Sequence, residues 1–246
     1  MKKIVIICDF NKNSGFGHLS RMRSLSKSFN PSSYDVIFLF ELKNKKFIQN
    51  YVKDLKCKYL SFNLKKISKQ IQDYLNQNLI DIIIFDSYRI DIKLEEKLYK
   101  SFFIVCVDDK VSKHNSHIVI NSREDLSSNE LSKPGQLWLT GKKFILMNKT
   151  QKKYSNKKSI NKILIHAGGS DAYKLIDNFF ESSITYLSTK NVVVDILYTN
   201  KKTHYELVKK INSLVNNKIK YRLLKFDRNF SKNLHKYDIV VGPAGT

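Results

Sequence analysis

Proline and cysteine are both scarce in this chain. Its 246 residues include 3 prolines and 3 cysteines, whereas 42% are hydrophobic. Few prolines and many apolar residues argue against intrinsic disorder and predict a soluble globular protein. The cysteines, Cys8, Cys57 and Cys106, are odd in number and far apart, and two of them lie inside apolar runs. We therefore expect reduced core cysteines in a cytoplasmic protein, and not a disulfide framework or a metal site.

Long apolar runs are also missing. No segment approaches the roughly 20 apolar residues that a membrane-spanning helix needs, so no stable membrane insertion is expected. The N-terminal apolar run is too short for a secretory signal and ends at Asp9, which indicates a strand.

The signatures of several common site types are absent. The chain has no P-loop string and no Gly-x-Ser-x-Gly elbow, which argues against a P-loop ATPase and a serine hydrolase. His114 and His117 are not spaced as metal ligands with any acidic or cysteine cluster. We expect neither a metal nor a cofactor.

Acidic residues are half as numerous as basic ones, 22 against 44, which gives a formal net charge of +22. Such a charge can attract nucleic acid, anionic lipid or a phosphorylated substrate. The lysines are spread along the chain, and no RNA-binding or helix-turn-helix signature accompanies them. We therefore expect no nucleic-acid partner, and a charge that helps to attract a phosphorylated small molecule.

Continuous apolar runs alternate with amphipathic segments through the first part of the chain. Strands are predicted at residues 4–8, 35–40, 59–60, 80–85, 103–107 and 117–120, and helices at 19–29, 47–55, 71–75 and 93–99. This alternation predicts a parallel sheet covered on both faces. Polar residues follow the strands, at the sheet edge where such folds bind ligands.

Residues 148–161 are almost entirely Lys, Asn, Ser, Gln and Thr, a composition typical of an interdomain linker. We therefore predict two domains, residues 1–147 and 162–246. In the second domain, strands are predicted at 163–165, 192–198, 220–224 and 238–241, and helices at 173–187, 203–214 and 229–237.

Two glycine turns each follow a strand and precede a helix. In the first, Gly15 and Gly17 allow a tight turn and a close backbone approach, and His18 begins the helix. The helix directs its free N–H groups and positive dipole end into that loop, and a histidine there can move a proton near neutral pH. The second turn, Gly168-Gly169, precedes Ser170 or Asp171 as a helix cap. Glycines alone are a weak signal, because the third glycine of the dinucleotide fingerprint is missing.

The string Gly15-Phe16-Gly17-His18-x-x-Arg21, with Asp9 before it, resembles the UDP-sugar hydrolases of pseudaminic acid biosynthesis. These are relatives of the MurG-like glycosyltransferases, which have the two-lobed GT-B fold. They release UDP from UDP-2,4-diacetamido-2,4,6-trideoxy-β-L-altropyranose.

Further resemblances follow in the order of that family. The segment from Asp86 through Tyr88 to Asp91 is similar to its Asp-His-Tyr-Gly-x-Asp element, although Ser87 replaces the histidine and Arg89 the glycine. Asp108-Asp109 resembles its paired aspartates, although aspartates also commonly cap the loop after a strand. Gly168 to Asp171 resembles its Gly-Gly-Ser-Asp turn.

The resemblance implies an α/β, GT-B-like protein with two Rossmann-like lobes, each with a parallel sheet, the C-terminal one incomplete. It implies that His18 is the general base toward a water at the anomeric carbon, that Asp9 orients His18 or that water, and that Tyr88 contacts sugar or phosphate. The substrate-binding residues would be Gly15, Gly17, Arg21, Asp86, Gly168, Gly169, Ser170, Asp171, Gly245 and Thr246.

Two other interpretations remain open. A GT-B glycosyltransferase has the same cleft and glycine turns but passes the sugar to an acceptor. A non-catalytic domain that binds a sugar nucleotide would accommodate the substitutions at Ser87 and Arg89 and the end of the chain inside a turn at Thr246.

Overall fold

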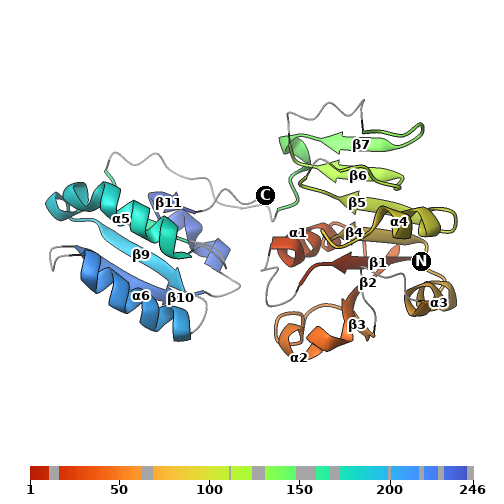
Figure 1. Ribbon diagram of the computed structural model, residues 1–246, viewed down its shortest axis with the longest axis horizontal. Coiled ribbons are helices and arrows are strands. Elements are labelled where there is room, and N and C mark those ends of the chain that lie inside the picture. The colour runs from red at the N-terminus through yellow and green to blue at the C-terminus, as the bar shows by residue number, and fades with distance from the viewer. Residues whose placement is uncertain are drawn as a thin grey trace. The chain divides into compact units, whose positions relative to one another are not determined.

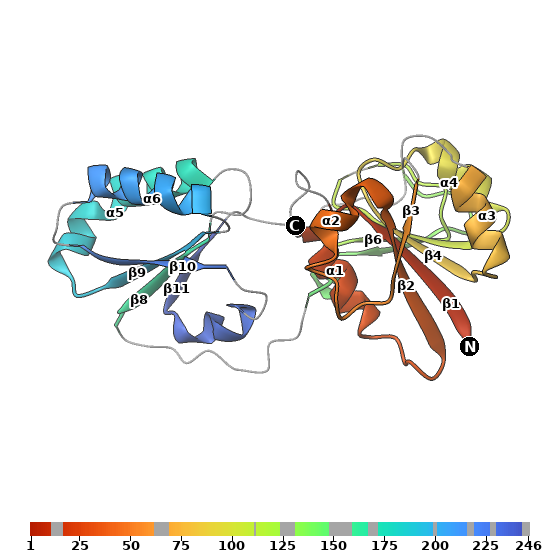
Figure 2. The same ribbon diagram turned by 90° about the horizontal axis from the view of Figure 1, so that it is seen from below.

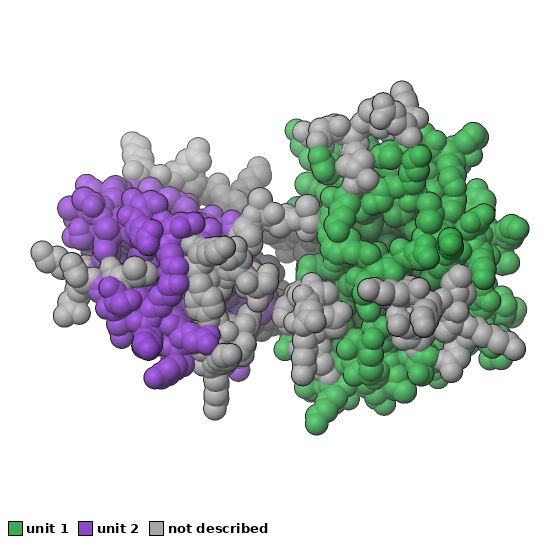
Figure 3. Space-filling view, in the orientation of Figure 1, with its two compact units in different colours: residues 1–148, 246 green, residues 149–245 purple. Residues whose placement is uncertain are grey.

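The computed structural model divides into two compact units, residues 1–148 with residue 246, and residues 149–245 (Figure 3). Each unit has its own parallel sheet and its own hydrophobic core. The structure describes residues 1–10, 17–61, 69–110, 112–123, 131–147, 159–166, 172–198, 201–215, 219–226 and 230–242. Most of the segment that we predicted to be a linker therefore lies outside the described residues.

The first unit is built on a seven-stranded parallel sheet with the order β3-β2-β1-β4-β5-β6-β7 (Figure 1). Its strands are β1 (Lys2–Cys8), β2 (Tyr34–Glu41), β3 (Cys57–Leu60), β4 (Ile82–Asp86), β5 (Phe103–Val107), β6 (Ile118–Asn121) and β7 (Leu137–Thr140). The predicted parallel α/β sheet is confirmed. Its central strands are apolar on both faces because both faces are covered.

Helices cover both faces of this sheet (Figure 2). They are α1 (Gly17–Ser26), α2 (Lys45–Ile48), α3 (Lys69–Gln77) and α4 (Ile92–Tyr99), with short 3₁₀ turns at Leu42–Asn44 and Lys142–Phe144. Met22 of α1 packs in one core with Ile6, whereas Leu75 of α3 and Leu98 of α4 pack in another with Val5. Consecutive β1 residues thus serve opposite cores, as the two-residue period of a strand requires.

The second unit has a four-stranded parallel sheet with the order β10-β9-β8-β11. Its elements are β8 (Lys162–Ile165), α5 (Ala172–Thr189), β9 (Val193–Tyr198), α6 (Lys201–Leu214), β10 (Lys220–Lys225), the 3₁₀ helix Phe230–Lys236 and β11 (Ile239–Val241). Helices α5 and α6 lie together on one face, and the 3₁₀ helix lies on the other (Figure 2).

A buried carboxylate stabilises the second unit. Asp195 on β9 is fully buried and accepts hydrogen bonds from Arg222 at 2.7 and 2.8 Å and from the Tyr237 hydroxyl at 2.9 Å. Burial alone would raise the pKa of Asp195, but these hydrogen bonds hold it below its usual value. The ionised carboxylate therefore connects β9 to β10 and to the chain after the 3₁₀ helix.

Helix α3 ends in a Schellman motif. The Ile80 N–H donates to Leu75 O and the Leu79 N–H donates to Asn76 O, both at 3.1 Å. Leu79 has a φ of 51°, in the left-handed region, and its side chain is 77% exposed. A leucine therefore occupies a position that favours glycine.

One local prediction was wrong, and one strand was missed. The sequence predicted a helix over residues 47–55, but α2 ends at Ile48 and turns follow, with Tyr51 N bonded to Ile48 O and Leu55 N bonded to Val52 O. These turns still bury Ile48 and Val52, so the apolar spacing was correct but not its conformation. Strand β7 was not predicted, because this short edge strand is only partly buried.

Candidate active site

Polar residues from several strands meet at one edge of the first sheet. Asp9 directly follows β1, Asp86 ends β4, and Asp109 lies two residues beyond β5. Strands β1, β4 and β5 are parallel neighbours, so their C-terminal ends lie side by side. The strand order reverses between β1 and β4, which is where open α/β sheets bind ligands. Helix α1 begins beside them and supplies His18.

His18 is paired with a fully buried carboxylate. Its Nδ1 atom lies 2.6 Å from Asp86 Oδ1, and the exposed fractions of the two residues are 6% and 0%. So short a contact with a carboxylate requires a proton between the atoms, so we assign Nδ1–H as the donor. Arg21 Nη2 also lies 3.0 Å from Nδ1, but both groups are donors in this tautomer, so this contact is not a hydrogen bond. In the neutral imidazole with this tautomer, Nε2 carries the lone pair.

Arg21, one turn into α1, holds Asp86 from the other side. It donates from Nε to Oδ2 at 2.6 Å and from Nη2 to Oδ1 at 2.5 Å, and a third bond reaches Asp109 at 2.8 Å. Burial alone would lower the pKa of Arg21, but these bonds raise it above its usual value. Arg21 is therefore a permanent cation beside Asp86.

Tyr88 covers the histidine. The two rings meet edge to face with their centroids 4.8 Å apart, and the Tyr88 hydroxyl donates to both Asp109 oxygens at 2.5 and 2.6 Å. Lys110 Nζ lies 4.2 Å from the centre of the Tyr88 ring. Partial burial and the Asp109 carboxylate raise the pKa of Tyr88 to about 12. Tyr88 therefore remains a neutral phenol near neutral pH, and half of its surface is exposed.

We predicted that Asp9 orients His18 or the attacking water; the structure gives the place beside His18 to Asp86, and the role toward water stays a prediction. Asp9 accepts hydrogen bonds from the Tyr88 backbone N–H at 3.1 Å and from Arg89 Nε at 2.7 Å, whereas Asp86 is the carboxylate on His18. Arg89 also donates to Glu41 at 3.0 Å, and both carboxylates are buried. Arg89 thus pairs with two buried acids, and Asp9 anchors the loop after β4.

The aspartate pair after β5 has two separate roles. Asp108 accepts the backbone N–H groups of Lys110 and Ser112, as in an ordinary loop cap, whereas Asp109 joins Arg21 and Tyr88. The sequence left the capping and site interpretations open, and each applies to one of the two residues.

A second buried cluster was missed from the sequence. Glu95 on α4, Cys106 on β5 and His114 lie close enough that one ligand atom from each falls within 4.8 Å of the others. Burial alone would lower the pKa of His114, but its bonds to Asp108, Cys106 and Glu95 raise it to about 12. Only the fold brings these residues together, so their spacing along the chain gave no signal.

Several predicted site residues lie outside the described residues: Gly15, Gly168, Gly169, Ser170, Asp171, Gly245 and Thr246. Gly17 is described, is exposed and begins α1. A Cβ atom there would meet no described atom within 4 Å, and its φ is not in the left-handed region. The fold itself therefore does not demand glycine at position 17, and the space beside it is open.

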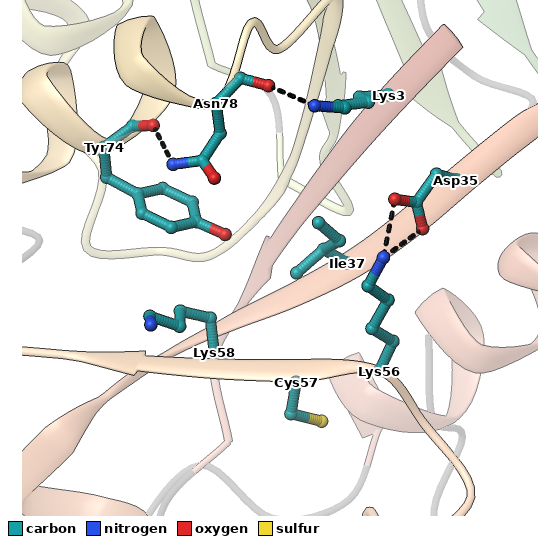
Figure 4. Close-up of a pocket in the computed structure, with 8 residues that line it drawn as sticks. All are labelled: Lys3, Asp35, Ile37, Lys56, Cys57, Lys58, Tyr74 and Asn78. Atoms are coloured by element: carbon teal, nitrogen blue, oxygen red, sulfur yellow. Dashed lines mark hydrogen bonds and ion pairs between the residues drawn. The ribbon is translucent and has the colours of Figure 1, made fainter. Parts of the chain in front are cut away.

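A separate hollow of about 280 Å³ lies toward the opposite edge of the sheet, between the starts of β1 and β2 and the strand β3 (Figure 4). Its lining includes Lys3, which donates to Asn78 O, and Lys56, which pairs with Asp35. It contains none of the residues around His18. We therefore place the candidate active site around His18, at the C-terminal ends of β1, β4 and β5.

Comparison with known proteins identifies the fold. No protein-family model matches the chain, and no curated protein matches it in sequence. MurG of Acinetobacter baumannii is similar in structure, with a TM-score of 0.62 and 10% identity over 98% of this chain and 73% of that one. A putative UDP-N-acetylglucosamine 2-epimerase of Listeria monocytogenes has a TM-score of 0.60 and 13% identity over 100% and 75%. A UDP-glucosyltransferase of Polygonum tinctorium has a TM-score of 0.53 and 8% identity over 92% and 72%.

These likenesses, at 8–13% identity, establish the fold alone. The chain thus has the α/β, parallel-sheet architecture of GT-B proteins. In the part of the chain that the structure describes, no helix combines the length and the apolar character needed to cross a membrane.

Proposed function

We propose that this protein hydrolyses a UDP-2,4-diacetamido-trideoxyhexose to UDP and free sugar, for nonulosonic acid synthesis of the pseudaminic type. The observation that carries the proposal is the buried His18–Asp86 pair at the C-terminal strand edge. The sugar identity rests on the sequence resemblance around His18 and Asp86.

In this reaction His18 Nε2 takes a proton from a water molecule as the water oxygen bonds to the anomeric carbon. The bond from that carbon to the UDP oxygen breaks, and UDP leaves with the electron pair. Asp86, fully buried and fixed by Arg21, stabilises the imidazolium that forms. The tautomer that Asp86 selects is the one in which Nε2 can accept the proton.

The departing diphosphate needs positive partners. The first N–H groups of α1 have no partner inside the helix, and a helix N-terminus favours an anion. Among the described residues, no atom lies within 4 Å of the position that a Cβ atom of Gly17 would take. The predicted contact of Gly168 and Gly169 with the diphosphate stays a prediction, because both lie outside the described residues. Tyr88, half exposed beside His18, would contact the sugar or a phosphate.

The fold supports a UDP-sugar substrate without selecting the acceptor. Among the similar structures, one is named a UDP-N-acetylglucosamine 2-epimerase and another a UDP-glucosyltransferase. The same histidine could take its proton from an acceptor hydroxyl instead of water, so a GT-B glycosyltransferase is the second candidate.

A proton-NMR time course with the UDP-2,4-diacetamido-trideoxyhexose and no acceptor separates these functions. We expect UDP and free reducing sugar from the wild-type protein, no turnover from His18→Asn, and unchanged turnover from His204→Asn, a matched change on α6. Substrate binding without turnover would favour the transferase. Full activity of His18→Asn would remove the basis of the proposal.

A further inference from the structure

A carboxylate, a thiol and an imidazole meet away from His18. Glu95 Oε1 lies 2.9 Å from His114 Nδ1 and 3.4 Å from Cys106 Sγ. Glu95 and Cys106 are 3% and 2% exposed, so a helix and a strand bury these two groups together. The proposed hydrolysis uses none of the three residues.

The separations suit one metal ion. Zinc bonds of about 2.0–2.3 Å at tetrahedral angles place neighbouring ligand atoms about 3.3–3.8 Å apart. The measured separations are 2.9 and 3.4 Å, and all three ligand atoms lie within 4.8 Å of one another. Small side-chain shifts would therefore bring Glu95, Cys106 and His114 into a common coordination sphere.

The surrounding contacts match those of metal-bound histidines. Asp108 Oδ2 lies 3.2 Å from Nε2 of His114, the ring nitrogen that faces away from Glu95. A metal-ligating histidine usually donates its other N–H to a carboxylate, which fixes the ring and its tautomer. Glu95 is fixed too, because its Oε2 accepts the Asn115 backbone N–H at 2.6 Å.

We propose that Glu95, Cys106 and His114 bind a divalent transition-metal ion, with zinc the best match to one sulfur, one nitrogen and one oxygen ligand. Magnesium and calcium prefer sites made of oxygen ligands alone, so the thiol and the imidazole disfavour them. Three protein ligands leave a fourth position for water. The ion would connect α4 to β5 and to the loop after it.

Binding is a proton exchange with no redox change. Bonds form from the metal to the Cys106 sulfur, His114 Nδ1 and a Glu95 oxygen, and the protons on sulfur and Nδ1 pass to solvent. The competing occupant is a proton on His114, held between the Glu95 and Asp108 carboxylates. Metal binding and a protonated His114 therefore exclude each other.

Cobalt(II) distinguishes the two occupants because a thiolate bound to cobalt absorbs strongly in the near ultraviolet. We would titrate the tag-free, metal-stripped protein with cobalt, then displace cobalt with zinc. We expect one cobalt per chain, a thiolate band in the wild-type protein and in Cys57→Ser, and at least a tenfold loss of affinity without that band in Cys106→Ser. Cys57 is a matched control, because it is also a free cysteine, on β3.

The wild-type titration alone can overturn the proposal. No cobalt or zinc binding at micromolar protein, with NMR showing both ring N–H protons on His114 in the presence of zinc, would establish the protonated cluster instead. A thiolate band that persists in Cys106→Ser would place the metal elsewhere. If Cys106→Ser fails to fold, Glu95→Gln provides the same comparison, with weaker binding expected.

Discussion

Replacing Asp86 by asparagine tests the proposed active site most directly. Asp86 accepts one hydrogen bond from His18 and two from Arg21, all at 2.5–2.6 Å, in a fully buried position. An asparagine has one acceptor oxygen, and its amide nitrogen only donates, so it cannot accept all three hydrogen bonds. If its oxygen takes the Oδ1 position, which accepts from both His18 and Arg21, only the bond from Arg21 Nε is lost. If its amide group takes that position, His18 changes tautomer so that Nδ1 accepts and Nε2 carries the proton. In the second case, His18 can no longer accept a proton from water.

The substitution should lower both the stability of the protein and its rate of turnover. Removing one partner of a buried ion pair typically costs about 3–5 kcal/mol, and Asp109 still pairs with Arg21, so we expect about 3 kcal/mol less stability. For the rate, losing the carboxylate that holds a metal-bound histidine costs about 10–100-fold, and the wrong tautomer in a serine-protease triad costs about 10⁴-fold. We therefore expect kcat to fall by about 10²–10⁴-fold in Asp86→Asn.

The assay is UDP release as a function of pH, with urea unfolding of the same preparations. Asp109→Asn is the control, because it removes one Arg21 bond and the Tyr88 bonds but leaves the contact between His18 and Asp86. Its kcat should stay at least about tenfold above that of Asp86→Asn. A folded Asp86→Asn protein that turns over at the wild-type rate would refute the role given to the pair.

Three further predictions concern stability. Leu79→Gly should raise the free energy of unfolding by about 1 kcal/mol in urea titrations, because it relieves a left-handed leucine; a loss would refute this reading. Arg89→Gly should cost about 3 kcal/mol in the same assay, because the buried Asp9 loses the Arg89 cation and Glu41 keeps only its longer contact with Lys43. Asp195 has a depressed native pKa, so its contribution is present above its usual value of 3.8 and is lost as the pH falls through the native pKa. Acid unfolding followed by circular dichroism should therefore begin at higher pH in Arg222→Met than in the wild-type protein.

The sequence predicted the parallel sheet well because its strands are continuous apolar runs, a signal that depends on neighbours along the chain. It also placed Asp86 and Tyr88 at a strand end, where the structure finds them beside His18. Their action on a substrate stays a prediction. The partners of individual side chains could not be predicted as well from the sequence. Asp9 and Asp86 lie at the ends of neighbouring strands, and only the packing of α1 decides which of them contacts His18.

The cluster at His114 shows the same limit more sharply. Its members come from a helix, a strand and a loop, and their separations in sequence match no known ligand spacing. Arg89 is a similar case. It pairs with two buried acids, Asp9 and Glu41, and nothing in the sequence indicates that either one is its partner.

The pair at the centre of the site consists of residues 68 positions apart in the chain. They come together when β1 pairs with β4. This parallel pairing closes a long loop of chain that contains β2, β3 and α3. Contacts between distant parts of a chain form slowly, because the entropy of closing the loop is lost before the contact stabilises anything. In a refolding experiment, helical signal should therefore return before the imidazole resonances of His18 take their native position. Catalytic activity should therefore return only when β1 and β4 have paired, and not at the earlier collapse of the chain.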